Sequence, residues 1–234
     1  MNKIIKKVDG VKSIIEALEL QKLGVDLIGV FINSDLAFGN EVIVDKATII
    51  AIKGELEKSK LVGVLYMPFD DEAILALIDE VEFDYIQIVG HILPSVFFRK
   101  ELQKRRIGII YSGIAASYDD DPTWILSRYV EKSDLNVSYY HVNFLGEVSN
   151  SWNFTKNKSP QYPDELQLAD IIELASNYPL LITYDFSVDN IKEIVDQIPT
   201  IKGISMMIAE KSEKNNEHIL NYSSVVAVLN KLSE

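Results

Sequence analysis

Short runs rich in β-branched and aromatic residues alternate with amphipathic helical segments from one end of the chain to the other. This alternation is typical of parallel strands joined by right-handed helical crossovers. Eight such units favour a closed (β/α)8 TIM barrel over an open doubly wound sheet. We therefore predict a single barrel domain over residues 1–234. The strand-like runs are "IIKKV" (4–8), "DLIGVFI" (26–32), "LVGVLYM" (61–67), "DYIQIVG" (84–90), "RIGIIYS" (106–112), "NVSYYHV" (136–142), "LLITYDF" (180–186) and "GISMMI" (203–208).

Helix signals lie between these runs. "DDEAILALIDEV" (70–81) and "SVDNIKEIVDQI" (187–198) repeat apolar residues with helical spacing. Asp121-Pro122 is a helix-start signal and predicts a helix over "TWILSRYV" (123–130). The long connection 143–163 is unusual for a compact domain, and we interpret it as a lid or binding loop, or else as disordered.

Composition excludes several classes of function. A formal net charge of -12 argues against nucleic acid, which needs a concentrated basic face. The chain has no cysteine, so neither disulfides nor cysteine metal sites are possible. No stretch approaches the roughly 20 apolar residues that span a bilayer. We expect a cytoplasmic protein with a small-molecule substrate and without nucleic-acid or membrane partners. The sequence leaves the oligomeric state open.

In a barrel of this kind the functional groups gather at the carboxyl ends of the strands. Asp9 and His141 are the candidate catalytic residues there, although Asp9 could instead cap the following helix and His141 could be an ordinary core residue. No metal-ligand or nucleotide-loop spacing is present, so we predict neither a metal nor a cofactor. The candidate substrate-binding residues are Asn33, Gln87, Tyr111, Tyr184, Asp185 and Ser205.

Several stretches resemble one family of barrel enzymes, the phosphoribosylanthranilate isomerases of tryptophan biosynthesis. "KVDG" (7–10) resembles the family's opening strand. "LVGVLYMPFDDEAILALIDEVEFDYIQIVG" (61–90) resembles its third strand, third helix and fourth strand, and "FSVDNIKEIVDQI" (186–198) the segment after its seventh. The resemblance covers most of the chain and implies the same scaffold.

The positions that match the family's working residues carry other side chains. Asp9 stands at the general-base cysteine, His141 at the general-acid aspartate, and Leu36 at an arginine after the second strand. Tyr184-Asp185 stands at paired glycines that help to hold the substrate phosphate, and 206–210 at a Ser-Ser-Gly-Val-Glu stretch. A negative charge in place of a backbone cradle would repel phosphate, so we predict that the phosphorylated substrate is not used.

Asp9 and His141 still supply a base and an acid, because a carboxylate can accept a proton and the pKa of histidine is ordinarily near 6.5. We therefore predict an isomerase or lyase that uses this pair on a small metabolite. Two alternatives remain open: an authentic phosphoribosylanthranilate isomerase with an unusual site, and a non-catalytic barrel that binds a metabolite or a protein.

Overall fold

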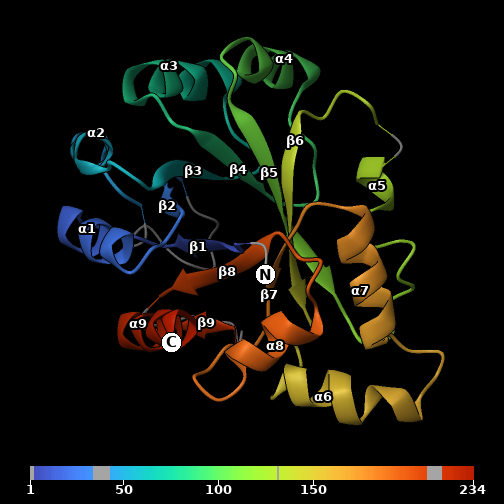
Figure 1. The fold of residues 1–234 in the computed structure, drawn as a ribbon. Coiled ribbons are helices and arrows are strands. Elements are labelled where there is room, and N and C mark those ends of the chain that lie inside the picture. Colours follow the sequence, from blue (N-terminus) through green and yellow to red (C-terminus); the bar gives the residue numbers. More distant parts are fainter. Residues whose placement is uncertain (1–2, 34–42, 131, 210–217) are drawn as a thin grey trace.

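The computed structural model describes residues 3–33, 43–130, 132–209 and 218–234. Eight parallel strands follow one another around a closed barrel, because β1 pairs with both β2 and β8. The strands are β1 (Ile5–Asp9), β2 (Leu27–Phe31), β3 (Lys60–Tyr66), β4 (Tyr85–Val89), β5 (Gly108–Ala116), β6 (Val137–Phe144), β7 (Leu180–Thr183) and β8 (Gly203–Ile208). The predicted (β/α)8 barrel is confirmed (Figure 1).

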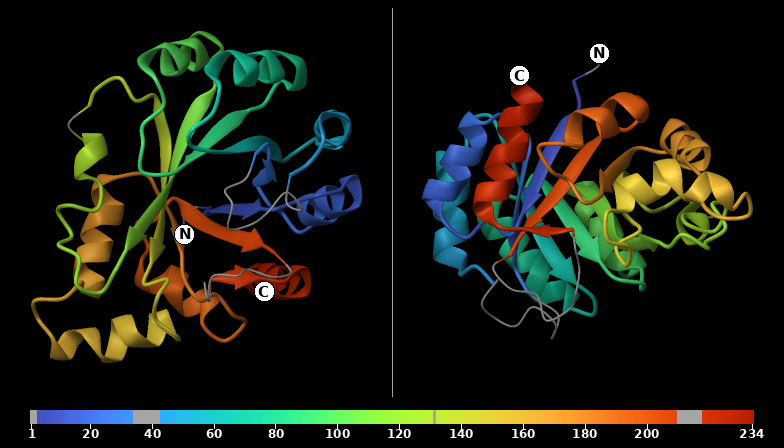
Figure 2. Two further views of the ribbon diagram at one scale, coloured as in Figure 1. Left: turned by 180° about the vertical axis from the view of Figure 1, so that it is seen from behind. Right: turned by 90° about the horizontal axis from the view of Figure 1, so that it is seen from below.

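Helices surround the strands (Figure 1). They are α1 (Ile14–Lys22), α2 (Lys46–Glu55), α3 (Asp71–Val81), α4 (Val96–Lys104), α5 (Ser127–Val130), α6 (Ser151–Asn157), α7 (Leu168–Asn177), α8 (Ile191–Gln197) and α9 (Tyr222–Ser233), with a short 3-10 helix η2 (Ser159–Gln161). Seen from the side, both ends of the chain lie at the end of the barrel where the strands begin (Figure 2). The opposite end is where the candidate residues were expected.

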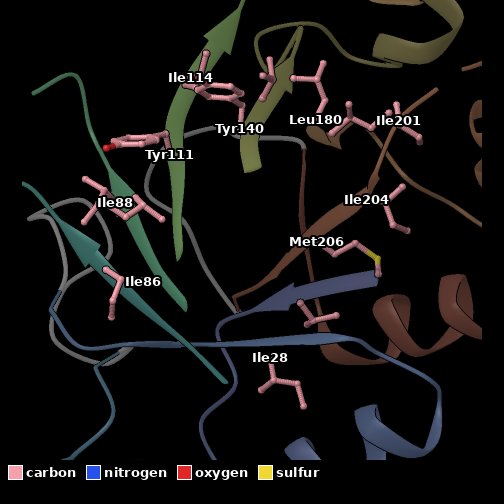
Figure 3. Close-up of a cluster of buried hydrophobic side chains, with 14 of the residues drawn as sticks. Ile28, Ile86, Ile88, Tyr111, Ile114, Tyr140, Leu180, Ile201, Ile204 and Met206 are labelled. Carbon is pink, nitrogen blue, oxygen red and sulfur yellow. The ribbon is translucent and has the colours of Figure 1, made fainter. Parts of the chain in front are cut away.

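Each strand divides its side chains between two cores, because successive residues point to opposite faces. The larger core lies between the barrel and the helices, and Figure 3 shows part of it, with Ile86, Ile88 and Tyr111 on neighbouring strands. A smaller cluster inside the barrel contains Leu27, Phe31, Val62, Val64, Ile110 and Leu181. In β1 the alternation sends Val8 to the outer core and Lys7 and Asp9 into the barrel.

Several predicted boundaries were wrong, among them that of the fifth strand, which continues to Ala116. The helix expected over 123–130 is reduced to the single turn α5, because Asp121 accepts from the backbone N–H and the hydroxyl of Thr123 and so forms a local turn instead. The seventh strand ends at Thr183, so Tyr184 and Asp185 lie in the connection that follows it.

The connection 143–163 contains regular structure. β6 continues to Phe144, and α6 and η2 follow within the segment. α6 lies against α8, where Trp152 donates its indole N–H to Glu193 at 3.1 Å and Lys156 forms an ion pair with the same carboxylate. Its role as a lid stays a prediction.

An additional strand, β9 (Ile219–Leu220), pairs in parallel with the end of β8. Met207 faces Ile219 and Ile208 faces Leu220, beyond the two residues of β8 that pair with β7. The sequence reading missed this strand, since two residues carry no periodic pattern. It brings His218 to the carboxyl end of the barrel.

Candidate functional site

A cavity of about 370 Å³ opens where the barrel strands end. One part of its lining is apolar, with Phe31 and Tyr66 stacked at 5.9 Å between ring centroids. The other part is polar and comes from most of the barrel strands and from the start of β9. The polar lining consists of Asp9, Gln87, Ser112, His141, Asn143, Thr183 and His218.

Asp9 ends β1 and reaches into this cavity. Its carboxylate forms an ion pair with Lys7, and its Oδ2 accepts from Gln87 Nε2 at 3.2 Å. Asp9 does not cap α1, because Ser13 is the N-cap residue and forms a capping box with Glu16. The helix-cap alternative is therefore excluded.

The Lys7 ammonium lies inside the barrel and is fully buried. Burial lowers its pKa, and the neighbouring Asp9 carboxylate opposes that change. A buried charge needs a partner in the protein interior, so Lys7 and Asp9 depend on each other. The two occupy one face of β1 as residues i and i+2.

Gly29 makes the position of Asp9 possible. A Cβ at residue 29 would lie 1.9 Å from Asp9 Oδ1, far inside van der Waals contact. The Asp9 carboxylate therefore leans over the bare backbone of β2. The same oxygen, Asp9 Oδ1, has no hydrogen-bond partner among the described residues, and neither has Gln87 Oε1. These buried acceptors in the cavity lining are available to a hydrogen-bond donor.

His141 projects from β6 into the same cavity. Thr183 Oγ1 donates its single hydrogen to the Ser205 carbonyl at 2.7 Å, so it accepts from His141 Nε2 at 2.8 Å. Nδ1, 3.0 Å from Ser112 Oγ, then accepts from that hydroxyl. These contacts define a neutral imidazole with its proton on Nε2.

The pKa of His141 agrees with this assignment. Burial and the Lys7 charge lower it to about 3, and Asp9 opposes the shift. The expectation of a pKa near 6.5 was wrong because it took no account of the closed barrel interior. His141 can thus donate a hydrogen bond as a neutral imidazole, but it holds no additional proton at neutral pH.

A chain of polar contacts connects the two candidates. Gln87 Nε2 lies within reach of Asp9 Oδ2 and, at 3.5 Å, of Ser112 Oγ, which in turn contacts His141. The structure thus brings Asp9, Gln87 and His141 together as expected. Ser205 lies inside the barrel, 1 % exposed, and reaches this chain through its carbonyl.

Three other candidates lie elsewhere. Tyr111 lies among the side chains of the outer core (Figure 3) and does not line the cavity. Its hydroxyl donates to the Leu135 carbonyl at 2.9 Å. Asn33 binds both backbone groups of Tyr66, at 2.9 and 2.7 Å, and so joins the ends of β2 and β3. Tyr184 is buried against Trp152, and its hydroxyl contacts Thr155.

Asp185 holds the start of α6. Its Oδ1 accepts from the Trp152 backbone N–H at 2.9 Å and from the Ser151 hydroxyl at 2.7 Å. Leu36 and Glu210, which the sequence resemblance aligned with two further family positions, lie outside the described residues.

Strand alternation could have found two of the residues that were missed. Ile110 faces the barrel interior, so Ser112 does as well and Tyr111 does not. Leu181 also faces the barrel interior, so the same alternation predicts that Thr183, two residues later, faces the cavity and that Tyr184 does not. His218 had no such signal, because only the pairing of β9 places it.

The described residues contain no group of three or more His, Cys, Asp or Glu arranged to hold a metal ion. Within the same ranges no helix is long and apolar enough to cross a membrane.

Fold and site together define a (β/α)8 barrel with a polar cavity at the carboxyl ends of its strands. No protein-family model and no curated protein matches the sequence. Solved structures of similar fold include the phosphoribosylanthranilate isomerase of Thermus thermophilus, with 15% identity over 98% of both chains and a TM-score of 0.62. That of Pyrococcus furiosus is also 15% identical, over 99% of both chains, with a TM-score of 0.67.

Another phosphoribosylanthranilate isomerase of similar fold was solved in complex with reduced 1-(o-carboxyphenylamino)-1-deoxyribulose 5-phosphate. It is 12% identical over 99% of both chains, with a TM-score of 0.68. The resemblance in fold that the sequence indicated is thereby confirmed.

Proposed function

We propose that the protein is an isomerase or lyase that acts on a small metabolite without a phosphate group. Asp9 accepts a proton from a substrate carbon, and neutral His141 donates a hydrogen bond to the oxygen on which charge develops. The observation that carries the proposal is that Asp9 and His141, from strands that are not neighbours, line one cavity. A non-catalytic barrel with a mouth filled by side chains would have no such cavity.

The connections after β7 and β8 support the part of the proposal that concerns phosphate. Phosphate sites in such barrels use free backbone N–H groups at these connections. Here the Ala209 N–H donates to Leu220 of the β9 segment at 3.1 Å, and the Asp185 N–H lies 3.3 Å from Ser151 Oγ. The Asp185 carboxylate adds a negative charge at the same place.

Hydrogen exchange with solvent tests the proposal without a known substrate. We would incubate the protein in D2O with unphosphorylated aldoses, ketoses and their aniline glycosylamines, and follow deuterium uptake at carbon by NMR. The wild type should exchange at least one of these compounds, and Asp9→Asn should slow that exchange by roughly 10²–10⁴-fold. Exchange that is equally fast in both proteins would overturn Asp9 as the base.

Asp9→Asn should also lower the thermal stability of the protein, because the buried ammonium of Lys7 loses its counter-charge. Lys7→Met with Asp9→Asn is the appropriate companion variant. It removes the unpaired charge while the base stays absent, so a folded double variant without exchange separates catalysis from stability.

A further inference from the structure

His218 lies on the cavity wall in a polar network that the proposed reaction has not used. Its Nε2 lies 3.0 Å from Ser151 Oγ, and its Nδ1 contacts Asn143 Oδ1. Ser151 is also bonded to Asp185. The network joins the end of β6, the start of α6, the connection after β7 and the residue before β9, and His218 is 3 % exposed.

The hydrogen bonds of this network, as they are oriented in the structure, assign a charge to the imidazole. A serine hydroxyl has one hydrogen and a carboxylate can only accept. Ser151 Oγ therefore donates to Asp185 Oδ1, and His218 Nε2 must donate to Ser151 Oγ. With the amide oxygen of Asn143 toward the ring, as the structure has it, this oxygen is also an acceptor, so Nδ1 carries a hydrogen too. His218 is consequently an imidazolium ion.

An acidic group lies close to that charge. The described residues in contact with His218 include Asn143 from β6, Ser151 from α6 and the ring of Tyr184, at 6.5 Å between centroids. Asp185 follows through Ser151, and among these groups it is the one that carries a charge. An acidic group one hydroxyl away favours the protonated imidazole.

We propose that His218 is the general acid of this cavity and the proton-donating partner of Asp9. This inference rests on the proposed function, and it assigns the proton that neutral His141 does not hold. His218 and Asp9 line the same cavity. Neutral His141 has a single ring hydrogen, on Nε2, which serves as a hydrogen-bond donor and is not an additional proton that can be transferred.

The proton transfer balances within the site. Asp9 takes the proton of the substrate C–H bond, and the electron pair of that bond moves toward the substrate oxygen. His218 Nδ1 gives its hydrogen to that oxygen, which takes the place of Asn143 Oδ1 as the acceptor. Asp9 ends protonated and His218 ends neutral, and both return to their starting states by exchange with solvent after the product leaves.

The protonation state can be measured in the free protein. The chain has three histidines, so ¹⁵N labelling of histidine gives three imidazole spectra, which His91→Gln, His141→Gln and His218→Gln assign. At pH 7 His218 should show two protonated nitrogens, and His141 one protonated Nε2 and one bare Nδ1. A bare nitrogen on His218 at pH 7 would overturn the proposal, because the acid would then have no proton to give.

Asp185→Asn tests the charge balance while it keeps an oxygen that can accept from Ser151. The pH at which His218 loses its proton should fall by about one unit. Glu193→Gln is the matched control, since this carboxylate contacts α6 through Trp152 and Lys156 and not through Ser151. An Asp185→Asn titration that coincides with the control would contradict the assignment.

The experiments distinguish a failure of the His218 assignment from a failure of the proposed function. A neutral His218 overturns the acid and leaves Asp9-dependent deuterium exchange unaffected. Exchange that is indifferent to Asp9 overturns the proposed function, whatever the protonation state of His218.

Discussion

At the scale of single residues, the position of Asp9 depends both on the missing side chain of Gly29 and on the positive charge of Lys7. Gly29 leaves room for the carboxylate, and Lys7 provides the charge that makes its burial tolerable. Ser13, and not Asp9, is the N-cap residue of α1. The side chain is thus held in the cavity by three local conditions, each of which can be altered separately.

Gly29→Ala should destabilise the protein by about 1–3 kcal/mol, because the added methyl group collides with Asp9 Oδ1 and overpacks the barrel interior. Gly54→Ala in α2 is the control. Its new methyl group meets nothing within 4 Å, and alanine is the better helix former, so the free energy of unfolding should rise by up to about 1 kcal/mol. Urea denaturation measures both, and equal effects would contradict the packing described for Asp9.

His141 should make the protein sensitive to acid. Its pKa in the folded protein is about 3 and ordinarily 6.5, so the unfolded chain binds more protons between these values. The stability due to neutral His141 is complete above pH 6.5 and is lost as the pH falls toward 3, by about 1.4 kcal/mol per pH unit. Urea denaturation at pH 7, 6 and 5 should show this slope in the wild type and a weaker slope in His141→Gln. Parallel slopes would contradict a lowered pKa of His141 in the folded protein.

The sequence predicted that Asp9, Gln87 and His141 line the cavity, because the ends of strands can be recognised in a single chain. The prediction was wrong for Tyr111, whose place in the alternation of side chains along β5 directs it to the outer core. His218 was not predicted at all. The pKa of His141 was also beyond the reach of the sequence. That value depends on burial and on a lysine three strands away around the closed barrel, which no local pattern reports.

At the scale of elements, the strands were predictable because each is a run of apolar residues that two cores can accept. α6 and β9 were not, because both form through contacts distant in sequence. α6 begins where Asp185 accepts the Trp152 N–H, and β9 exists only by pairing with β8. The two elements meet at Ser151, which contacts both Asp185 and His218.

Ser151→Ala should therefore destabilise the protein by about 1–3 kcal/mol, because it leaves buried hydrogen-bonding groups of Asp185 and His218 without their common partner. Ser176→Ala on α7 is the control, since among the described residues this exposed hydroxyl donates to the Ile172 carbonyl of its own helix and to no other group. Its effect should stay within about 0.5 kcal/mol. Thermal denaturation gives both values, and a Ser151→Ala protein as stable as the control would show that the network contributes nothing to stability.

At the scale of the whole molecule, the eightfold alternation was sufficient to predict closure of the barrel. The function of the protein could not be predicted from this alternation, because barrels of the same fold carry different functional sites. The described part of the chain keeps the scaffold of the phosphoribosylanthranilate isomerase structures over nearly its whole length, at 12 to 15% identity. Of the residues that the sequence comparison aligned with the family's working positions, Asp9 and His141 line the cavity, and Tyr184 and Asp185 follow β7.

Expression of the protein should not rescue a tryptophan auxotroph that lacks phosphoribosylanthranilate isomerase. Catalytic residues that act as one unit fail together when they are replaced, and Asp9 and His141 stand where a cysteine and an aspartate are expected. Growth on medium without tryptophan, compared with a strain that carries the authentic enzyme, provides the readout. Sustained growth would favour the authentic isomerase instead.

The central claim is that the barrel keeps an acid–base cavity and has no place for a substrate phosphate. Calorimetric titration with reduced 1-(o-carboxyphenylamino)-1-deoxyribulose 5-phosphate, and with the same compound lacking its phosphate, tests it most directly. Asp185 and the backbone pairing of β9 lead us to expect that the phosphate brings no gain in affinity. A phosphorylated compound that binds about 100-fold more tightly, a difference of about 2.7 kcal/mol, would contradict the account.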